Sequence, residues 1–252
     1  MLKSVWAPPL ARPHDRGDLN LSAGAPRDTT AFELREALAQ PGCAICALAL
    51  RSVGRFIASL AYDRVNDIQI RAELRAARGF CNLHAHRWLR EAHSVLGTAL
   101  IYRDVVNTAV QDLATLKDRG RLGLLDRLRG RTSDASRADT CLACAAQHEA
   151  EQRYLSGLAA ILTDPGDAAL FDGSDGVCLP HALAAVRSGD SSAERVMLHA
   201  RAHAERLIAS LDEVIRKEDY RFRDEPRTAD ERAAPADVVA WTIGADGLST
   251  DL

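Results

Sequence analysis

Several features common in proteins are scarce in this chain. Aromatic side chains make up only 5% of the 252 residues, so a core must be built mostly from leucine, alanine, valine and isoleucine. A strong net charge is also absent. The formal charge is −3 at pH 7, which provides no global field to draw the chain to nucleic acid or to an anionic membrane. With 47% hydrophobic and 27% charged residues, the composition is typical of a soluble globular protein.

Long apolar runs are missing as well. No stretch approaches the roughly 20 apolar residues that span a bilayer, and the first 20 residues contain no apolar segment of the kind found in secretory signals. We therefore expect a cytoplasmic protein with no membrane association. Thiols stay reduced in that compartment, where C-x-x-C pairs are more often metal or redox sites than structural disulfides.

The chain also lacks the short motifs of common enzymes. It contains no phosphate-binding glycine loop, no G-x-S-x-G elbow and no dinucleotide fingerprint. No segment alternates between apolar and polar residues over the length of a strand. The sequence therefore predicts an all-α fold and no catalytic residues, which leaves enzymatic activity undecided but disfavoured.

What the chain does have is six cysteines in two matched sets. Each set begins with C-x-x-C and ends with G-x-C-x-x-H, and the intervals between the two motifs are 34 and 33 residues. These motifs contain the eight candidate metal ligands: Cys43, Cys46, Cys81 and His84 in the first set, and Cys141, Cys144, Cys178 and His181 in the second.

The matched spacing predicts a tandem duplication. A shift of 98 residues places Arg55 and Phe56 on Arg153 and Tyr154. We expect a helical bundle of two pseudo-symmetric half-repeats. The expected divisions are an irregular N-terminal arm (1–28), half-repeat 1 (29–117), a linker (118–139), half-repeat 2 (140–222) and a C-terminal tail (223–252).

Local patterns predict where the helices lie. Thr30 and Glu33 have the spacing of a capping box, and the helix that they begin stops before Pro41. The run from Cys81 to about residue 117 contains no proline and predicts one long buried helix. In the second half we expect a loop at Asp164–Gly166 and, beyond Pro226, a mixed tail with one helical patch at 238–243.

Three thiolates and one imidazole form the ligand set that zinc takes in closed tetrahedral sites. Because all four positions are filled by protein, such a site is typical of structural rather than catalytic zinc. We expect two zinc ions, with the cysteines at helix N-termini, where the helix dipole favours thiolates. Each half is first taken to gather its own four ligands, and an exchange of ligands between the halves stays open.

Other interpretations of the same residues remain. An iron–sulfur cluster also takes cysteine thiolates and sometimes histidine, and each C-x-x-C could cycle between dithiol and disulfide. His199 and His203 are four residues apart on a predicted helix, a spacing that can bind a metal, and they support the weaker alternative of a metal-dependent enzyme. The basic stretch at 117–131 has no interleaved aromatic residues, which disfavours nucleic-acid binding.

The pattern as a whole resembles an uncharacterised bacterial family, found mainly in actinobacteria, with duplicated C-x-x-C and G-x-C-x-x-H motifs. The matching segments are "PGCAIC", "VND", "GFCNLH", "ALIY", "CLAC", "GVCLPH" and "RKEDYRFRDEP". The resemblance implies a helical cytosolic protein with metal-binding cysteines and no assigned activity. Glu218 stands where the resemblance would place a histidine.

We therefore interpret the chain as a metal-binding interaction or scaffold protein whose partner is another, unidentified protein. The alternative is a thiol-based redox or metal sensor that works by zinc release or through an iron–sulfur cluster. The sequence names neither the partner nor the oligomeric state.

Overall fold

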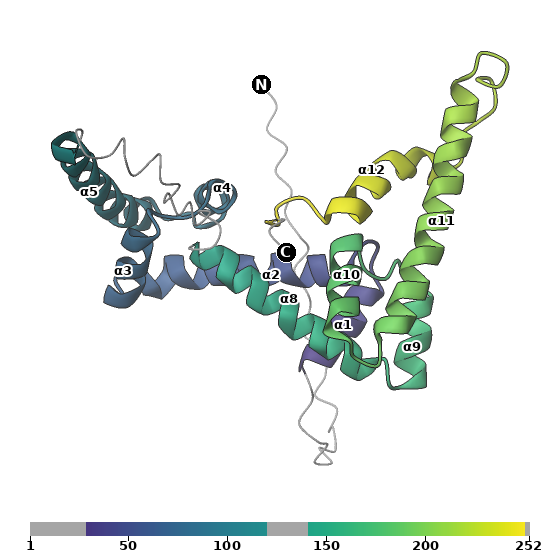
Figure 1. Ribbon diagram of the computed structural model, residues 1–252, viewed down its shortest axis with the longest axis horizontal. Helices are drawn as coiled ribbons and strands as arrows, with labels where there is room; N and C mark the ends of the chain where they lie inside the picture. Colours follow the sequence, from purple (N-terminus) through teal and green to yellow (C-terminus); the bar gives the residue numbers. More distant parts are fainter. Residues whose placement is uncertain (1–28, 120–140, 250–252) are drawn as a thin grey trace, which may run out of the picture.

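The computed structural model describes residues 29–119 and 141–249. Throughout these ranges the chain folds into helices and contains no strand, so the predicted all-α class is confirmed (Figure 1). The predicted arm at 1–28 and nearly all of the predicted linker lie outside the described residues.

Residues 29–119 form six helical elements. They are α1 (Thr29–Leu38), α2 (Ala44–Ser59), the π-helical turn η1 (Leu60–Arg64), α3 (Ile68–Ala76), α4 (Asn82–Glu91) and α5 (Val95–Arg119). Residues 141–249 form α8 (Leu142–Ile161), α9 (Pro165–Asp172), α10 (Leu179–Ser188), α11 (Ala193–Glu218) and α12 (Ala229–Ile243).

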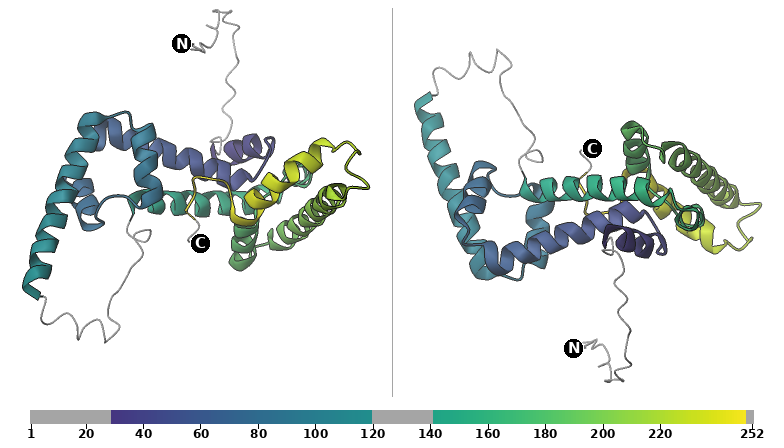
Figure 2. Two further views of the ribbon diagram at one scale, coloured as in Figure 1. Left: turned by 90° about the horizontal axis from the view of Figure 1, so that it is seen from above. Right: turned by 90° about the horizontal axis from the view of Figure 1, so that it is seen from below.

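The two helices that begin with C-x-x-C, α2 and α8, lie side by side at the centre of the molecule and run in opposite directions (Figures 1 and 2). Ile45 near the start of α2 shares a core cluster with Leu158 near the end of α8. Ile57 near the end of α2 shares a second cluster with Ala143 at the start of α8. The first cluster continues toward α9, α10 and α11, and the second continues toward α3, α4 and α5.

Helix α2 also corrects the expectation that no segment could span a membrane. Together with η1 it forms a 21-residue helix, Ala44–Arg64, whose mean hydropathy of 1.5 is high enough for a membrane span. The position of α2 in the core accounts for this composition, because Leu48, Val53 and Leu60 are completely buried against the other helices. The described residues contain one such helix.

The prediction of one long buried helix from Cys81 onward is wrong. The chain breaks between α4 and α5, where His93 adopts a positive φ of 46°. Neither glycine nor proline marks this break, so no local sequence pattern predicts it. Several apolar residues of α5 lie on the surface rather than in the core, including Val95 (89% exposed) and Leu96 (70% exposed).

Two expectations for the second half are also corrected. The segment at Asp164–Gly166 is not a loop but the start of α9, with Asp164 as the N-cap and Pro165 in the first turn, the position where proline is tolerated best. The helical patch in the tail extends over all of α12. A capping box between Thr228 and Glu231 begins this helix, and Pro235 lies inside it.

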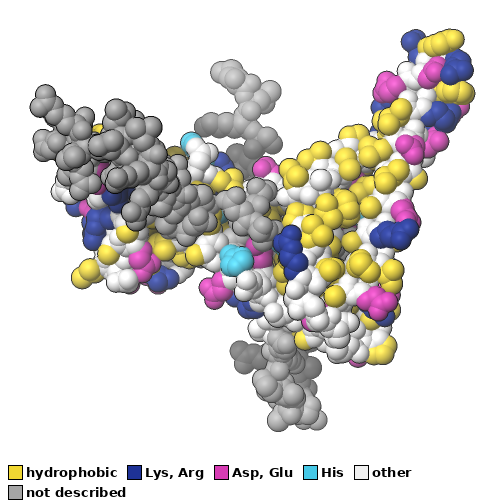
Figure 3. Space-filling view, in the orientation of Figure 1, with side chains coloured by type: hydrophobic (Ala, Val, Ile, Leu, Met, Phe, Trp, Pro, Cys, Tyr) yellow, Lys and Arg dark blue, Asp and Glu magenta, His cyan; other side chains and the backbone are white. Residues whose placement is uncertain are grey.

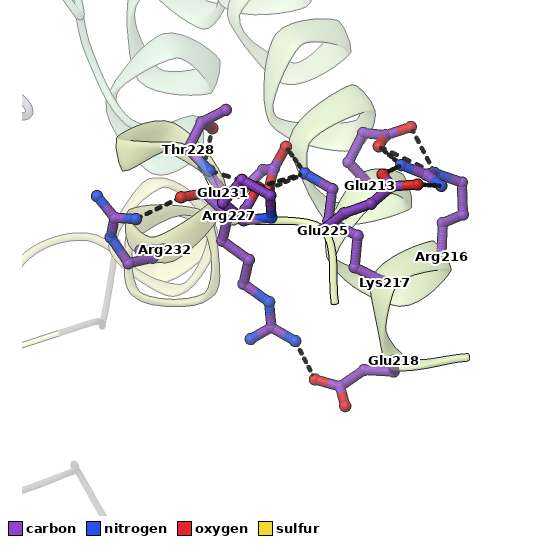
Figure 4. A network of polar contacts seen from close by, with 10 residues as sticks. Glu213, Arg216, Lys217, Glu218, Glu225, Arg227, Thr228, Glu231 and Arg232 are labelled. Carbon is purple, nitrogen blue, oxygen red and sulfur yellow. Dashed lines mark hydrogen bonds and ion pairs between the residues drawn. The ribbon is translucent and has the colours of Figure 1, made fainter. Parts of the chain in front are cut away.

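Helix α12 is attached to the end of α11 by a polar network (Figure 4). The ammonium group of Lys217 donates to both carboxylate oxygens of Glu231, at 2.8 and 2.7 Å. Both side chains are only 8% exposed. A buried ion pair is costly to leave half-satisfied, so this contact fixes where α12 starts and turns it back along the molecule.

The order of elements is alike in the two halves. A C-x-x-C helix, a short helix, a C-x-x-H helix and a long helix follow one another as α2 to α5 and again as α8 to α11. This order agrees with the proposed duplication, which stays a prediction because a shared order of elements does not by itself establish a repeat.

Candidate metal centres

Each of the four cysteine motifs begins a helix. Cys43, Cys81, Cys141 and Cys178 are the N-caps of α2, α4, α8 and α10, and all four have extended backbones. The second ligand of each motif follows three residues later, in the first helical turn. Because the side chains of an N-cap and of the third helical residue lie on the same side of a helix start, each motif presents two ligands together. The predicted placement at helix N-termini is confirmed.

The structure gathers all eight predicted ligands into two groups whose donor atoms lie within 4.8 Å of one another. These are the only such groups of three or more in the described ranges. We call them the first centre and the second centre. The first centre is Cys43, Cys46, Cys178 and His181, and the second centre is Cys81, His84, Cys141 and Cys144.

The assumption that each half gathers its own ligands is therefore wrong. Each centre combines the C-x-x-C of one half with the C-x-x-H of the other. The reason is the length of the intervening helices. The 16 residues of α2 span about 24 Å, so the chain leaves α2 far from Cys43 and reaches Cys81 beside the start of the antiparallel helix α8. Helix α8 returns the chain in the same way to the start of α2.

The distances between ligand atoms fit a single tetrahedral ion. For zinc–ligand bonds of about 2.3 Å to sulfur and 2.0 Å to nitrogen, a tetrahedron has edges of about 3.8 Å between sulfurs and 3.5 Å between sulfur and nitrogen. In the first centre, Cys46 Sγ and Cys178 Sγ are 3.6 Å apart, and His181 Nδ1 lies 3.1–3.5 Å from the three sulfurs.

The second centre has similar edges. Cys81 Sγ and Cys144 Sγ are 3.6 Å apart, and His84 Nδ1 lies 3.3–3.8 Å from the three sulfurs. All six cysteines are free thiols, and these sulfur separations are far longer than the roughly 2.05 Å of a disulfide bond. In both centres the described residues offer no hydrogen-bond partner for the outer Nε2 of the histidine, while Nδ1 faces the thiols.

The two thiols of the C-x-x-C in the first centre have pKa values shifted in opposite directions. Burial alone would raise the pKa of Cys43, but hydrogen bonds with Cys178, Cys46 and His181 hold this pKa well below its usual value. Hydrogen bonds with Cys178 and Cys43, reinforced by burial, raise the pKa of Cys46. Although burial opposes the charged ring, hydrogen bonds with Cys178 and Cys43, reinforced by the nearby carboxylate of Glu151, raise the pKa of His181 to about 12.

The two thiols of the C-x-x-C in the second centre also have pKa values shifted in opposite directions. A hydrogen bond with Cys144 outweighs burial and, with a further one from His84, lowers the pKa of Cys141 to about 3. The thiolate of Cys141, together with burial, raises the pKa of Cys144. Each C-x-x-C thus holds one ionised thiol and one protonated thiol that an incoming ion would have to deprotonate.

A carboxylate stands behind the histidine of the first centre. Glu151 Oε1 lies 3.7 Å from His181 Nε2, and the Glu151 side chain is only 3% exposed. Gln147 donates to Glu151 at 2.8 Å and to the backbone oxygen of Ser249 at 2.9 Å, and the amide of Ser249 donates back to Gln147. Carboxylates in this position orient metal-ligating histidines.

Sequence reasoning missed Glu151 and Gln147 as parts of the site. The only available indication was two polar residues at 147 and 151 on a face of α8 that is otherwise apolar, since Ala143, Ala150 and Tyr154 are all buried.

Glycines place the two C-x-x-H motifs. Gly79 and Gly176 precede them by two residues, with positive φ values of 91° and 72°, a region that favours glycine. The Gly176 backbone also lies directly against the ring of His199, where an added Cβ would come within 2.6 Å. The ring of His199 packs against Phe171 at a tilt of 49°, with 4.7 Å between ring centroids. The structure thus gives His199 a packing contact beside the first centre and does not place it with His203 in a metal-binding group.

Comparisons with known proteins identify relatives but no activity. Residues 29–236 match a family of unknown function, DUF6062. The chain is also 25% identical over 205 residues to an "Uncharacterized 23.9 kDa protein in xynA 3'region" from Caldicellulosiruptor sp., a match that covers 80% of this chain and 95% of that protein. No solved structure is significantly similar to the chain. Because the family match spans well over half of its length, this chain belongs to the family of unknown function DUF6062.

Proposed function

We propose that this protein is a zinc-binding helical module in which two Cys3His centres clamp the ends of the antiparallel pair α2 and α8. The observation that carries the proposal is the set of ligand-to-ligand distances, 3.6 Å between sulfurs and 3.1–3.8 Å from histidine nitrogen to sulfur. These distances match the edges of a tetrahedron around one zinc ion.

The same distances argue against an iron–sulfur cluster. A cluster places two or more iron atoms and bridging sulfides among its protein ligands, so its ligands must stand farther apart than those of a single ion. All four donor atoms of each centre lie within 4.8 Å of one another. Zinc bound here would have no open position, which favours a structural role over a catalytic one.

The proposed location is the cytoplasm, where six free thiols stay reduced and available to zinc. The proposed activity is that of an interaction or scaffold module for a protein partner. Two exposed regions support this activity. The turn between α11 and α12 presents Tyr220, which is 80% exposed. One face of α5 presents Val106, Val110 and Leu113, each more than half exposed.

Metal analysis tests the proposal directly. Protein purified without oxygen should contain two zinc ions per chain and show no visible absorption. His86→Ala is the matched control, because His86 is exposed and lies on the same helix as the ligand His84, and this variant should keep both ions. Absence of bound metal, or a coloured protein that contains iron and sulfide, would contradict the proposal.

The second candidate function is a thiol-based sensor that releases zinc on oxidation. It is favoured by the partly exposed thiols Cys43 and Cys144, one in each centre. Peroxide oxidises two thiols to one disulfide and is reduced to two molecules of water. Zinc release on addition of peroxide, followed by recovery with a dithiol, would support this function. Retention of both ions would exclude it.

A further inference from the structure

A cavity of about 600 Å³ adjoins the first centre. The three cysteines of that centre line one side of it, and residues of α11 and α12 line the other. A second cavity, between α1, α2 and α8, is lined by none of the eight candidate ligands. The lining of the cavity beside the first centre includes Asp175, His203, Asp237, Ala240 and Trp241.

The first centre is closed on its other side. His181 is 1% exposed and Glu151 is 2% exposed, and the tail is tied across them by the contacts between Gln147 and Ser249. Gly244 also lies close to the centre, since a Cβ there would be 3.6 Å from Cys46 Sγ. Among the described residues, the cavity therefore provides an open approach for an ion that enters or leaves the centre, past the three sulfurs.

The size and charge of the cavity suit a hydrated divalent cation. A cation with six waters occupies roughly 200 Å³, well below the volume of the cavity. Asp175 and Asp237 are among its lining residues, and no lysine or arginine is. Burial, reinforced by the charge of Arg206, lowers the pKa of His203, so its ring is neutral at pH 7 and does not repel a cation.

We propose that this cavity is the exchange route of the first centre, through which a zinc-class divalent cation enters and leaves past Asp175, His203 and Asp237. The proposal rests on the proposed zinc-binding function and adds that one of the two ions exchanges through a defined opening. The three side chains guide the ion but do not hold it, because they form no metal-binding group among the described residues.

One wall of the route can be altered without touching a ligand. Ala240 lines the cavity on α12, and its side chain is exposed, so a larger residue there would fill the opening. Ala236 lies on the same helix, is also exposed, and does not line the cavity. Ala240→Trp and Ala236→Trp are therefore a matched pair.

The experiment mixes zinc-loaded full-length protein with an excess of the chromogenic chelator 4-(2-pyridylazo)resorcinol and follows zinc release over time. The phase that disappears in Cys178→Ser belongs to the first centre. Ala240→Trp should slow that phase about tenfold, equivalent to about 1.4 kcal/mol of activation free energy, while Ala236→Trp leaves it unchanged. Equal rates in both variants and the parent protein would overturn the proposal.

A second variant keeps the proposal testable if Ala240→Trp disturbs the helix. Asp237→Asn should slow zinc uptake into the metal-free first centre about fivefold at low salt, and the difference should fade as salt screens the carboxylate. Asp230→Asn on the same helix is the control. Uptake that is unaffected by Asp237→Asn at every salt concentration would overturn the route. A chain that binds fewer than two zinc ions would instead overturn the proposed function.

Discussion

The first and second centres have the same ligand types and different surroundings. Behind His181 of the first centre lies the buried carboxylate of Glu151, joined through Gln147 to the C-terminal tail. The position that corresponds to Glu151 after the 98-residue shift is Val53, which lies in the apolar cluster around the second centre together with Phe80 and Trp88. A carboxylate thus lies behind the histidine of the first centre, whereas the second centre lies beside an apolar cluster.

This difference shows that two centres with the same ligand types can differ in the side chains that surround the ligands. A carboxylate behind a metal-ligating histidine raises the basicity of the ring and fixes its orientation. An apolar environment fixes the orientation of the ring by packing alone. We therefore expect the two centres to bind the same ion with different strengths and to respond differently to mutation.

The largest effect is expected from removing ligands in pairs. Cys46→Ser with Cys178→Ser removes two ligands of the first centre and should leave one zinc ion per chain. Cys46→Ser with Cys81→Ser removes one ligand from each centre, although both cysteines belong to the same half of the sequence, and should leave none tightly bound. Metal analysis of the two double variants shows whether each centre takes its ligands from both halves of the chain or from one half. The opposite pattern of zinc contents would contradict ligands taken from both halves.

A smaller effect is expected from removing the charge of the carboxylate behind His181. Glu151→Gln should weaken zinc binding at the first centre by about 10- to 100-fold, the usual cost of losing such a partner, and leave the second centre unchanged. Glu149→Gln, an exposed position on the same helix, is the control. Competition with a chelator of known affinity measures both sites. Equal weakening at the two centres would show that Glu151 acts on the fold and not on His181.

Metal binding should depend on pH in both centres. The pKa values of Cys46 and Cys144 are raised by their thiolate neighbours, so both thiols are protonated at pH 7 without an ion. Zinc displaces these protons, and its affinity should therefore rise with pH by about tenfold per pH unit for each proton released. Calorimetry in buffers of different ionisation enthalpy counts the protons. Because the pKa of His181 is raised to about 12, its imidazolium proton should be among those that the first centre releases.

The smallest effect is expected at another matched position. Tyr154 of the second half corresponds to Phe56 of the first. Its hydroxyl donates to Glu33 at 2.5 Å and accepts from Arg55 at 3.3 Å. Tyr154→Phe places phenylalanine at this position in both halves. The variant should lower the free energy of unfolding by about 1.5 kcal/mol without a change in zinc content. Denaturant unfolding of the zinc-loaded protein provides the measurement, and loss of an ion in this variant would contradict a purely structural contact.

The sequence predicts the helical class and the eight residues that the structure gathers into two groups, because both follow from local patterns. The ligands occur as pairs three residues apart, and the periodicity of apolar residues is helical. The pairing of motifs depends instead on how α2 and α8 pack, which no local pattern specifies. The break at His93 and the support from Glu151 were missed for a related reason, since one has no glycine or proline to mark it and the other depends on a contact between α8 and α10.

The exchange of ligands has a consequence for the independence of the two halves. Residues 29–119 carry one C-x-x-C and one C-x-x-H at opposite ends of α2, and therefore hold half of each centre and neither centre complete. We expect that such a fragment would complete its centres by pairing antiparallel with a second copy, as α2 pairs with α8 in the intact chain. If the proposed duplication and zinc binding hold, the intact protein corresponds to an intramolecular dimer whose smallest complete metal-binding unit is the pair of halves.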